Sequence, residues 1–158
     1  MVDSGQRTKL AVRVPVTLGV MSRCPDAFVC ENVFDQVLDK VGHEKVDLSL
    51  TFIGKLNSSE PIYGVTCKHG SLECTGNIHE LCVAKYSGAS SIWWPFLRCL
   101  NYGGAESIGL ERTAKECSKV SDIDWSQSGI EACVNGEEGP RLLRESVKHT
   151  KQLGIQLS

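Results

Sequence analysis

The sequence predicts an α/β fold in which a strand, a helix and a second strand are followed by a cysteine-rich helical insertion and a last helix. Alternating apolar residues at 10–20 and 46–54 are typical of strands, whereas apolar residues spaced by three and four between 25 and 41 are typical of an amphipathic helix. Six of the eight cysteines lie between 57 and 139, among short helical stretches. These observations predict a βαβ unit with parallel strands and a right-handed crossover, extended by a disulfide-rich insertion.

Each element of this unit carries its own signals. The first strand, LAVRVPVTLGV, is rich in valine, and Pro15 within it indicates an edge position or a bulge. Pro25 suits the first turn of the helix, and Gly42 suits its end. The apolar side of this helix is expected to consist of Phe28, Val29, Val33, Phe34, Val37, Leu38 and Val41.

The end of the chain returns to the core of the domain. A strongly amphipathic helix is expected from about Pro140 to Leu153, where Gly154 ends it. Its buried side is expected to include Leu142, Leu143, Ser146, Val147 and Thr150. We therefore predict a single domain over residues 1–158, with a core formed by 9–56 and 140–158 and an insertion formed by 57–139.

Composition disfavours several classes of function. The 158 residues are 41% apolar and carry a net charge of -2, which describes one soluble domain and argues against nucleic acid as a partner. No stretch approaches the roughly 20 apolar residues of a membrane helix, so no membrane partner is expected. The even number of cysteines indicates disulfides and an oxidising compartment, although the first residues lack the features of a signal peptide. Asn57 begins a glycosylation sequon, an interpretation that competes evenly with an ordinary turn.

Cys24 is the candidate nucleophile. It follows the first strand and precedes Pro25 at a helix start, where unpaired N–H groups and the helix dipole stabilise a thiolate, and Arg23 would add to this effect. Cys30 lies six positions further on, and in a regular helix the two residues would be roughly 9 Å apart along the axis, beyond the limit of about 7 Å between Cα atoms for a disulfide. Either the chain folds back at Pro25 and Asp26, or the two cysteines do not pair directly and Cys30 is a small buried apolar residue.

The segment CKHGSLECTGNIHELC, residues 67–82, holds the strongest signal in the sequence. Its cysteines and histidines could supply zinc ligands, but their spacing does not match the usual paired arrangements, and disulfide loops are the favoured interpretation. We expect no metal, no cofactor and three structural disulfides of open pairing, formed by Cys67, Cys74, Cys82, Cys99, Cys117 and Cys133. The aromatic segment 93–96 is interpreted as core in preference to a peptide-binding surface.

This segment resembles the signature of the gamma-interferon-inducible lysosomal thiol reductase family, which reads C-Q-H-G, two residues, E-C, two residues, N, four residues, C. All signature positions but one are matched, since Lys68 replaces the glutamine; the matching residues are Cys67, His69, Gly70, Glu73, Cys74, Asn77 and Cys82. The likeness extends upstream to Cys24 and downstream to residue 155, and the CPDA sequence at 24–27 is most similar to the fungal branch of the family.

The resemblance implies a thioredoxin-like fold and a thiol-disulfide oxidoreductase that reduces disulfides of protein substrates with the help of a small thiol reductant. It places the enzyme in a lysosome or vacuole, or outside the cell after secretion. By the same resemblance Cys24 attacks a substrate disulfide, and a second cysteine resolves the mixed disulfide. An alternative is a secreted, disulfide-stapled binding protein that keeps the scaffold without turnover.

Two departures from the family bear on this expectation. The usual CxxC centre has its second cysteine at the position of Ala27, so assigning the resolving role to Cys30 is a hypothesis and not a carried-over property. A thioredoxin-like domain also continues after the last helix into a strand hairpin preceded by a cis-proline loop, and no proline follows Pro140. We therefore expect that the parent protein continues beyond Ser158 or that this form is impaired.

Overall fold

A parallel pair of strands forms the centre of the protein. The structure is a computed structural model that describes residues 12–156, and its first strand, β1 (Val14–Val20), pairs with β2 (Val46–Phe52) from Val14 opposite Val46 to Val20 opposite Phe52. Helix α1 (Pro25–Val41) and a short 3-10 helix (His43–Lys45) connect the two strands. The predicted parallel βαβ unit is confirmed, although β1 begins four residues later and β2 ends two residues earlier than the alternation indicated.

Helix α1 packs through only part of the predicted side, where Phe28 and Phe34 lie partly buried against the core. Leu38 is buried as expected, but Val29, Val33 and Val37 are 66%, 56% and 40% exposed. The buried side instead carries Ala27 and Glu31 in addition to Leu38. Apolar periodicity misassigned this side because it treats a glutamate as exposed, whereas hydrogen bonding inside the fold allows Glu31 to be buried.

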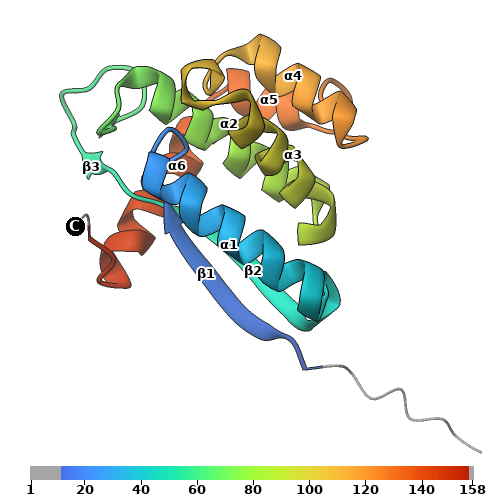
Figure 1. Cartoon of the computed structure of the whole chain (residues 1–158). Coiled ribbons are helices and arrows are strands. Elements are labelled where there is room, and N and C mark those ends of the chain that lie inside the picture. Colours follow the sequence, from blue (N-terminus) through green and yellow to red (C-terminus); the bar gives the residue numbers. More distant parts are fainter. Residues whose placement is uncertain (1–11, 157–158) are drawn as a thin grey trace, which may run out of the picture.

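A small second sheet and four helices lie between β2 and the last helix. The strands β3 (Lys55–Leu56) and β4 (Val65–Thr66) pair antiparallel, and four helices follow them, of which α3 lies beside α1 (Figure 1). The helices are α2 (Ser71–Ser87), α3 (Ser90–Gly103), α4 (Glu111–Val120) and α5 (Ile130–Asn135), with a short 3-10 helix at Ala105–Ser107.

Three disulfides hold the insertion together. Cys67–Cys74 closes the turn at the start of α2, Cys82–Cys133 joins α2 to α5, and Cys99–Cys117 joins α3 to α4. These bridges use the six cysteines that the sequence singled out as structural. Their sulfurs are therefore not available as the zinc ligands considered as the alternative, and the described residues contain no group of three potential ligands suited to a metal ion.

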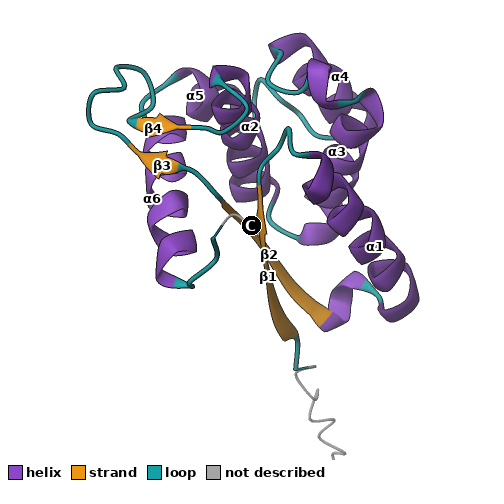
Figure 2. Cartoon of the chain, turned by 60° about the vertical axis from the view of Figure 1, so that its left-hand side comes forward, coloured by secondary structure: helices purple, strands orange, loops and turns teal. Residues whose placement is uncertain are grey.

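The last helix, α6 (Glu138–Gln152), returns to the strand pair and lies on the opposite side of it from α1 (Figure 2). It begins two residues earlier than predicted, and its Ser146 and Thr150 are buried as expected. Ser146 Oγ accepts a hydrogen bond from the Phe52 N–H at 2.8 Å, and Thr150 Oγ1 donates to the Phe52 carbonyl at 2.8 Å. Two hydroxyls of α6 thereby satisfy the backbone of β2 at its end, as buried polar groups require.

The aromatic segment of α3 belongs to the core. Trp93, Trp94 and Phe96 are at most 4% exposed, so the interpretation as core is confirmed and these rings do not form a peptide-binding surface. Trp94 Nε1 donates to Asp35 Oδ1 on α1 at 2.7 Å, which satisfies its polar edge. None of the helices described between residues 12 and 156 combines the length and the apolar character needed to cross a membrane.

Candidate functional site

Cys24 lies where β1 ends and α1 begins. It is the N-cap residue of α1, it is 6% exposed, and neither it nor Cys30 takes part in a disulfide. The helix is regular from its first turn, with the Phe28 N–H donating to the Cys24 carbonyl at 3.2 Å. The chain therefore does not fold back at Pro25 and Asp26, and five helical residues lie between Cys24 and Cys30, so that six steps of about 1.5 Å separate the two by roughly 9 Å along the axis.

The two free cysteines nevertheless share a cavity. Cys30 is exposed, so the expectation that it is a small buried apolar residue is wrong. Cys24 and Cys30 both line a hollow of about 220 Å³, together with Lys68 of the 67–82 segment. Its remaining lining is Gly19, Val20, Met21, Asp26, Ala27, Ile53, Ile155 and Gln156. A second cavity of about 440 Å³ adjoins it and shares Ile53, Ile155 and Gln156, which leaves space beside Cys24 for an extended chain.

The charge that reaches this cavity differs from the one predicted. Arg23 was expected to stabilise the Cys24 thiolate, but its guanidinium donates to the carbonyls of Ala105 at 2.8 Å and His69 at 3.4 Å and forms an ion pair with Glu106 at 3.4 Å. The ammonium-bearing side chain in the cavity lining is Lys68, the residue that departs from the signature. Lys68, and not Arg23, is therefore the positively charged side chain that lines the cavity with Cys24.

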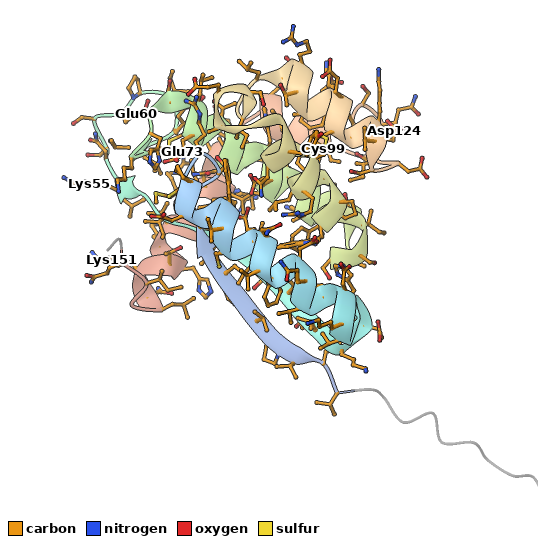
Figure 3. All side chains as sticks on the ribbon, viewed as in Figure 1. Lys55, Glu60, Glu73, Cys99, Asp124 and Lys151 are labelled. Carbon is orange, nitrogen blue, oxygen red and sulfur yellow. A yellow bond between two sulfur atoms is a disulfide. The ribbon has the colours of Figure 1, made fainter. Side chains whose placement is uncertain are left out.

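The turn before Cys24 is held by the 67–82 segment. The Ser22 N–H donates to Asn77 Oδ1 at 3.0 Å, and Ser22 Oγ donates to the Glu73 carbonyl at 3.1 Å. Figure 3 shows Glu73 beside the loop that leads into α1. The Glu73 carboxylate in turn accepts from the His69 N–H at 3.2 Å and pairs with His69 Nδ1 at 2.5 Å, which fixes the start of α2. Matching residues of the signature therefore lie directly behind the candidate nucleophile.

Buried carboxyl groups lie between α1, α2 and α3. Burial raises the pKa of Glu31 from 4.5 to about 7, although Asn101 Nδ2 donates to Glu31 Oε2 at 2.5 Å and Arg98 lies nearby, both of which lower it. Burial also raises the pKa of Glu80 well above its usual range, and the charges of Glu31 and Glu73 raise it further. These groups are therefore protonated at acidic pH and become charged in the interior as the pH rises.

We expect acid to stabilise the protein through Glu31. Between its unfolded pKa of 4.5 and its folded pKa of about 7, the folded chain binds a proton that the unfolded chain has lost. The stabilisation is thus fully present below pH 4.5 and is lost as the pH rises through 7, and it corresponds to about 3 kcal/mol. Urea unfolding of Glu31→Gln should show a gain in the free energy of unfolding over the native chain at pH 8 and no gain at pH 4.5.

His79 changes the stability with pH in the opposite direction to Glu31, and this change is present in the native chain and in the variant alike. Burial lowers the pKa of His79 from 6.5 to about 4, so its contribution is present above pH 6.5 and is lost as the pH falls through 4. Glu145→Gln, at an exposed position of α6, serves as the matched control and should change stability little at either pH. An equal effect of Glu31→Gln at pH 4.5 and pH 8 would contradict the assignment.

Several residues of the site were not found from the sequence. Ser22, Ile155 and Glu31 were not singled out, and Asn77 was noted only as a signature position. No sequence pattern could identify Ser22 as the hydrogen-bond partner of Asn77, because the two residues are 55 positions apart and meet only in the folded chain. Asn57, the predicted sequon, lies in the turn after β3, where its Oδ1 accepts from the Ser59 N–H and its Nδ2 donates to Thr66 Oγ1, both at 3.0 Å.

Comparison with known proteins also points to thiol-disulfide chemistry. The model of the family described as gamma interferon inducible lysosomal thiol reductase (GILT) matches residues 15–121, more than half of the chain. A gamma-interferon-inducible lysosomal thiol reductase from Carassius auratus is 32% identical over 91 residues, which cover 58% of this chain and 34% of that protein. The alignment thus spans about a third of the length of this curated relative. The α/β core with its disulfide-rich helical insertion accords with the thioredoxin-like fold that the resemblance implied. The chain belongs to the gamma-interferon-inducible lysosomal thiol reductase family.

Proposed function

We propose that this protein is a thiol-disulfide oxidoreductase that reduces disulfides of protein substrates through Cys24. The observation that carries the proposal is a free cysteine at the N-terminus of a 17-residue helix, on a cavity that also holds a lysine and a second free cysteine. A helix N-terminus is a common position for the attacking sulfur in disulfide exchange, and Lys68 adds a positively charged side chain to the lining of the same cavity. Membership of a thiol reductase family supports the same chemistry.

The first step of the proposed reaction takes place at Cys24 Sγ. The thiolate attacks one sulfur of a substrate disulfide, the S–S bond of the substrate breaks, and its second sulfur leaves as a thiolate. Cys24 is then joined to the substrate by a mixed disulfide. The adjoining cavity beside Ile53 and Ile155 offers room for the substrate chain that flanks the attacked cysteine.

We propose Cys30 as the sulfur that resolves this intermediate. Its thiolate attacks Cys24 Sγ, which releases the substrate as a thiol and leaves a Cys24–Cys30 disulfide that a small thiol reductant reduces. An axial separation of roughly 9 Å exceeds the reach of a disulfide, so the first turn of α1 has to open, including the bond between the Phe28 N–H and the Cys24 carbonyl.

The setting of the proposed activity follows the family resemblance. The relative from Carassius auratus is named for the lysosome, and we propose a lysosome, a vacuole or the extracellular space for this chain. Asn57 is the proposed glycosylation site, since its side chain lies in a surface turn and Nδ2 keeps one N–H for Thr66 after a glycan is attached. The large separation of the two free cysteines favours a second candidate, a disulfide-stapled binding protein without turnover.

Differential alkylation with mass spectrometry near pH 5 separates the two candidates. After incubation with excess insulin, an oxidoreductase should hold Cys24 in a mixed disulfide or in a bridge to Cys30, and a small thiol should return both to the alkylatable form. A binding protein should leave Cys24 alkylatable throughout. A bridge from Cys30 to one of the six cysteines of the insertion would contradict its resolving role.

A further inference from the structure

The turn that carries Cys24 is bound on one side by α2. Met21, Ser22 and Cys24 are at most 6% exposed, and the Cys24 N–H donates to the Met21 carbonyl at 3.0 Å, which closes the turn. The Ser22 N–H is not used within this turn and donates a hydrogen bond to Asn77 Oδ1 at 3.0 Å. We infer that Asn77 is the positioning residue of the nucleophile, an inference that rests on the function proposed above.

Asn77 is itself held in one orientation. Its side chain is fully buried, and Nδ2 lies 3.9 Å from Cys67 Sγ, within the Cys67–Cys74 disulfide. With the amide nitrogen directed to sulfur and the backbone N–H of Ser22 a donor, the oxygen has to face Ser22. The disulfide, the asparagine and the turn before Cys24 thus form a continuous series of contacts.

The neighbouring Gly76 shows how closely α2 approaches this turn. A Cβ atom at Gly76 would lie 2.6 Å from Ser22 Oγ and 2.6 Å from Ile108 Cγ2, closer than side chains tolerate. Ser22 Oγ also donates to the Glu73 carbonyl one turn earlier in α2. The absence of a side chain at residue 76 therefore allows both hydrogen bonds to form, one from the Ser22 N–H and one from its hydroxyl.

Loss of the Asn77 oxygen would act on Cys24 through the turn. The Ser22 N–H is buried, and a buried donor without a partner is strongly disfavoured, so the backbone of the turn would shift to find another acceptor. Cys24 is two residues away in the same closed turn and would shift with it. Small displacements of a reacting group of about 1 Å can lower a rate by about 100-fold.

The test compares three substitutions in the full chain. Asn77→Leu removes the acceptor at similar size. Asn77→Asp keeps an acceptor oxygen at the same place, and because residue 77 is fully buried, burial should raise the pKa of the new carboxyl group and keep a donor toward Cys67 at pH 5. Ser118→Ala is the matched control, because it removes a buried hydrogen bond of 2.9 Å to the Ala114 carbonyl in α4, away from the cavity. The free energy of unfolding is measured for all three, so that activities are compared at known stability.

Two readouts separate positioning from stability. The first is the rate at which iodoacetamide alkylates Cys24 in a Cys30→Ser background, and the second is kcat/KM for insulin reduction with Cys30 present. Asn77→Leu is expected to change the alkylation rate and to lower kcat/KM by about 10- to 100-fold. Asn77→Asp should keep the alkylation rate and kcat/KM close to the native values at pH 5. Ser118→Ala should also leave the alkylation rate and kcat/KM near the native values.

Each outcome decides one claim. If Asn77→Leu behaves like Ser118→Ala, or if Asn77→Asp at pH 5 is as impaired as Asn77→Leu, the inference is overturned. Absence of insulin turnover in the native chain would overturn the proposed function, whereas the alkylation rates would still test Asn77. If Asn77→Leu does not fold, hydrogen exchange in the native chain decides: the Ser22 amide should be protected, and exchange as fast as in an open loop would overturn the inference.

Discussion

Replacement of Cys24 by serine is expected to abolish catalysed reduction of protein disulfides. Only the uncatalysed reduction of the substrate by the small thiol should remain. A serine hydroxyl cannot form the mixed disulfide with which the proposed reaction begins, and no other free cysteine lies at a helix N-terminus. The measurement is insulin reduction near pH 5 over a range of thiol concentrations. Serine is close to cysteine in size, so the free energy of unfolding should stay near the native value while the activity is lost.

Cys30→Ser is the matched control for this prediction. The first attack at Cys24 should persist, so a covalent complex with the substrate should accumulate and be visible by mass spectrometry. Its release should then depend on the concentration of the small thiol, because the resolving sulfur is missing. Full activity of Cys24→Ser would remove Cys24 from the centre, and unchanged kinetics of Cys30→Ser would remove Cys30.

Removal of the Cys82–Cys133 bridge is expected to produce the largest loss of stability among the three disulfides. The bridge spans 51 residues and joins α2 to α5, and both cysteines are at most 1% exposed. Loop-closure entropy predicts a loss of about 4 kcal/mol for the pair Cys82→Ala and Cys133→Ala. Urea unfolding at a fixed pH measures this difference.

The bridge Cys99–Cys117 provides the comparison for that loss. It closes a separation of only 18 residues, for which the same relation predicts about 3 kcal/mol. The pair Cys99→Ala and Cys117→Ala should therefore unfold at a higher urea concentration than the pair at 82 and 133. The reverse order would show that packing around the sulfurs outweighs the entropy of the unfolded chain.

The backbone plan of the core could be predicted because it depends on local signals. Alternation identifies β1 and β2, and Pro25 and Gly42 mark the ends of α1, where the structure also begins and ends it. A helix between two strands of one sheet requires them to be parallel, and they are. The chain order of strand, cysteine and helix likewise placed Cys24 at a helix N-terminus before any contact was known.

The packing of α1 could not be predicted from the same signals. Val29 and Val33 fit an apolar stripe, yet the side that is buried carries Glu31, whose carboxyl group accepts a hydrogen bond from Asn101 on α3. Periodicity orders residues around one helix, but the partner that satisfies a buried carboxyl group comes from 70 positions further along the chain. The choice of side therefore depends on contacts that only the assembled fold creates.

By itself the sequence determined the α/β class, the parallel βαβ unit, the family and the position of Cys24 at the start of a helix. Only the tertiary structure decided which of the fifteen possible pairings of six cysteines occurs, and that α1 is regular between Cys24 and Cys30. It alone also joined Ser22 to Asn77. The physical reason is range: capping, turn and periodicity preferences act within a few residues, whereas disulfides and buried hydrogen bonds depend on the distance between groups that folding brings together.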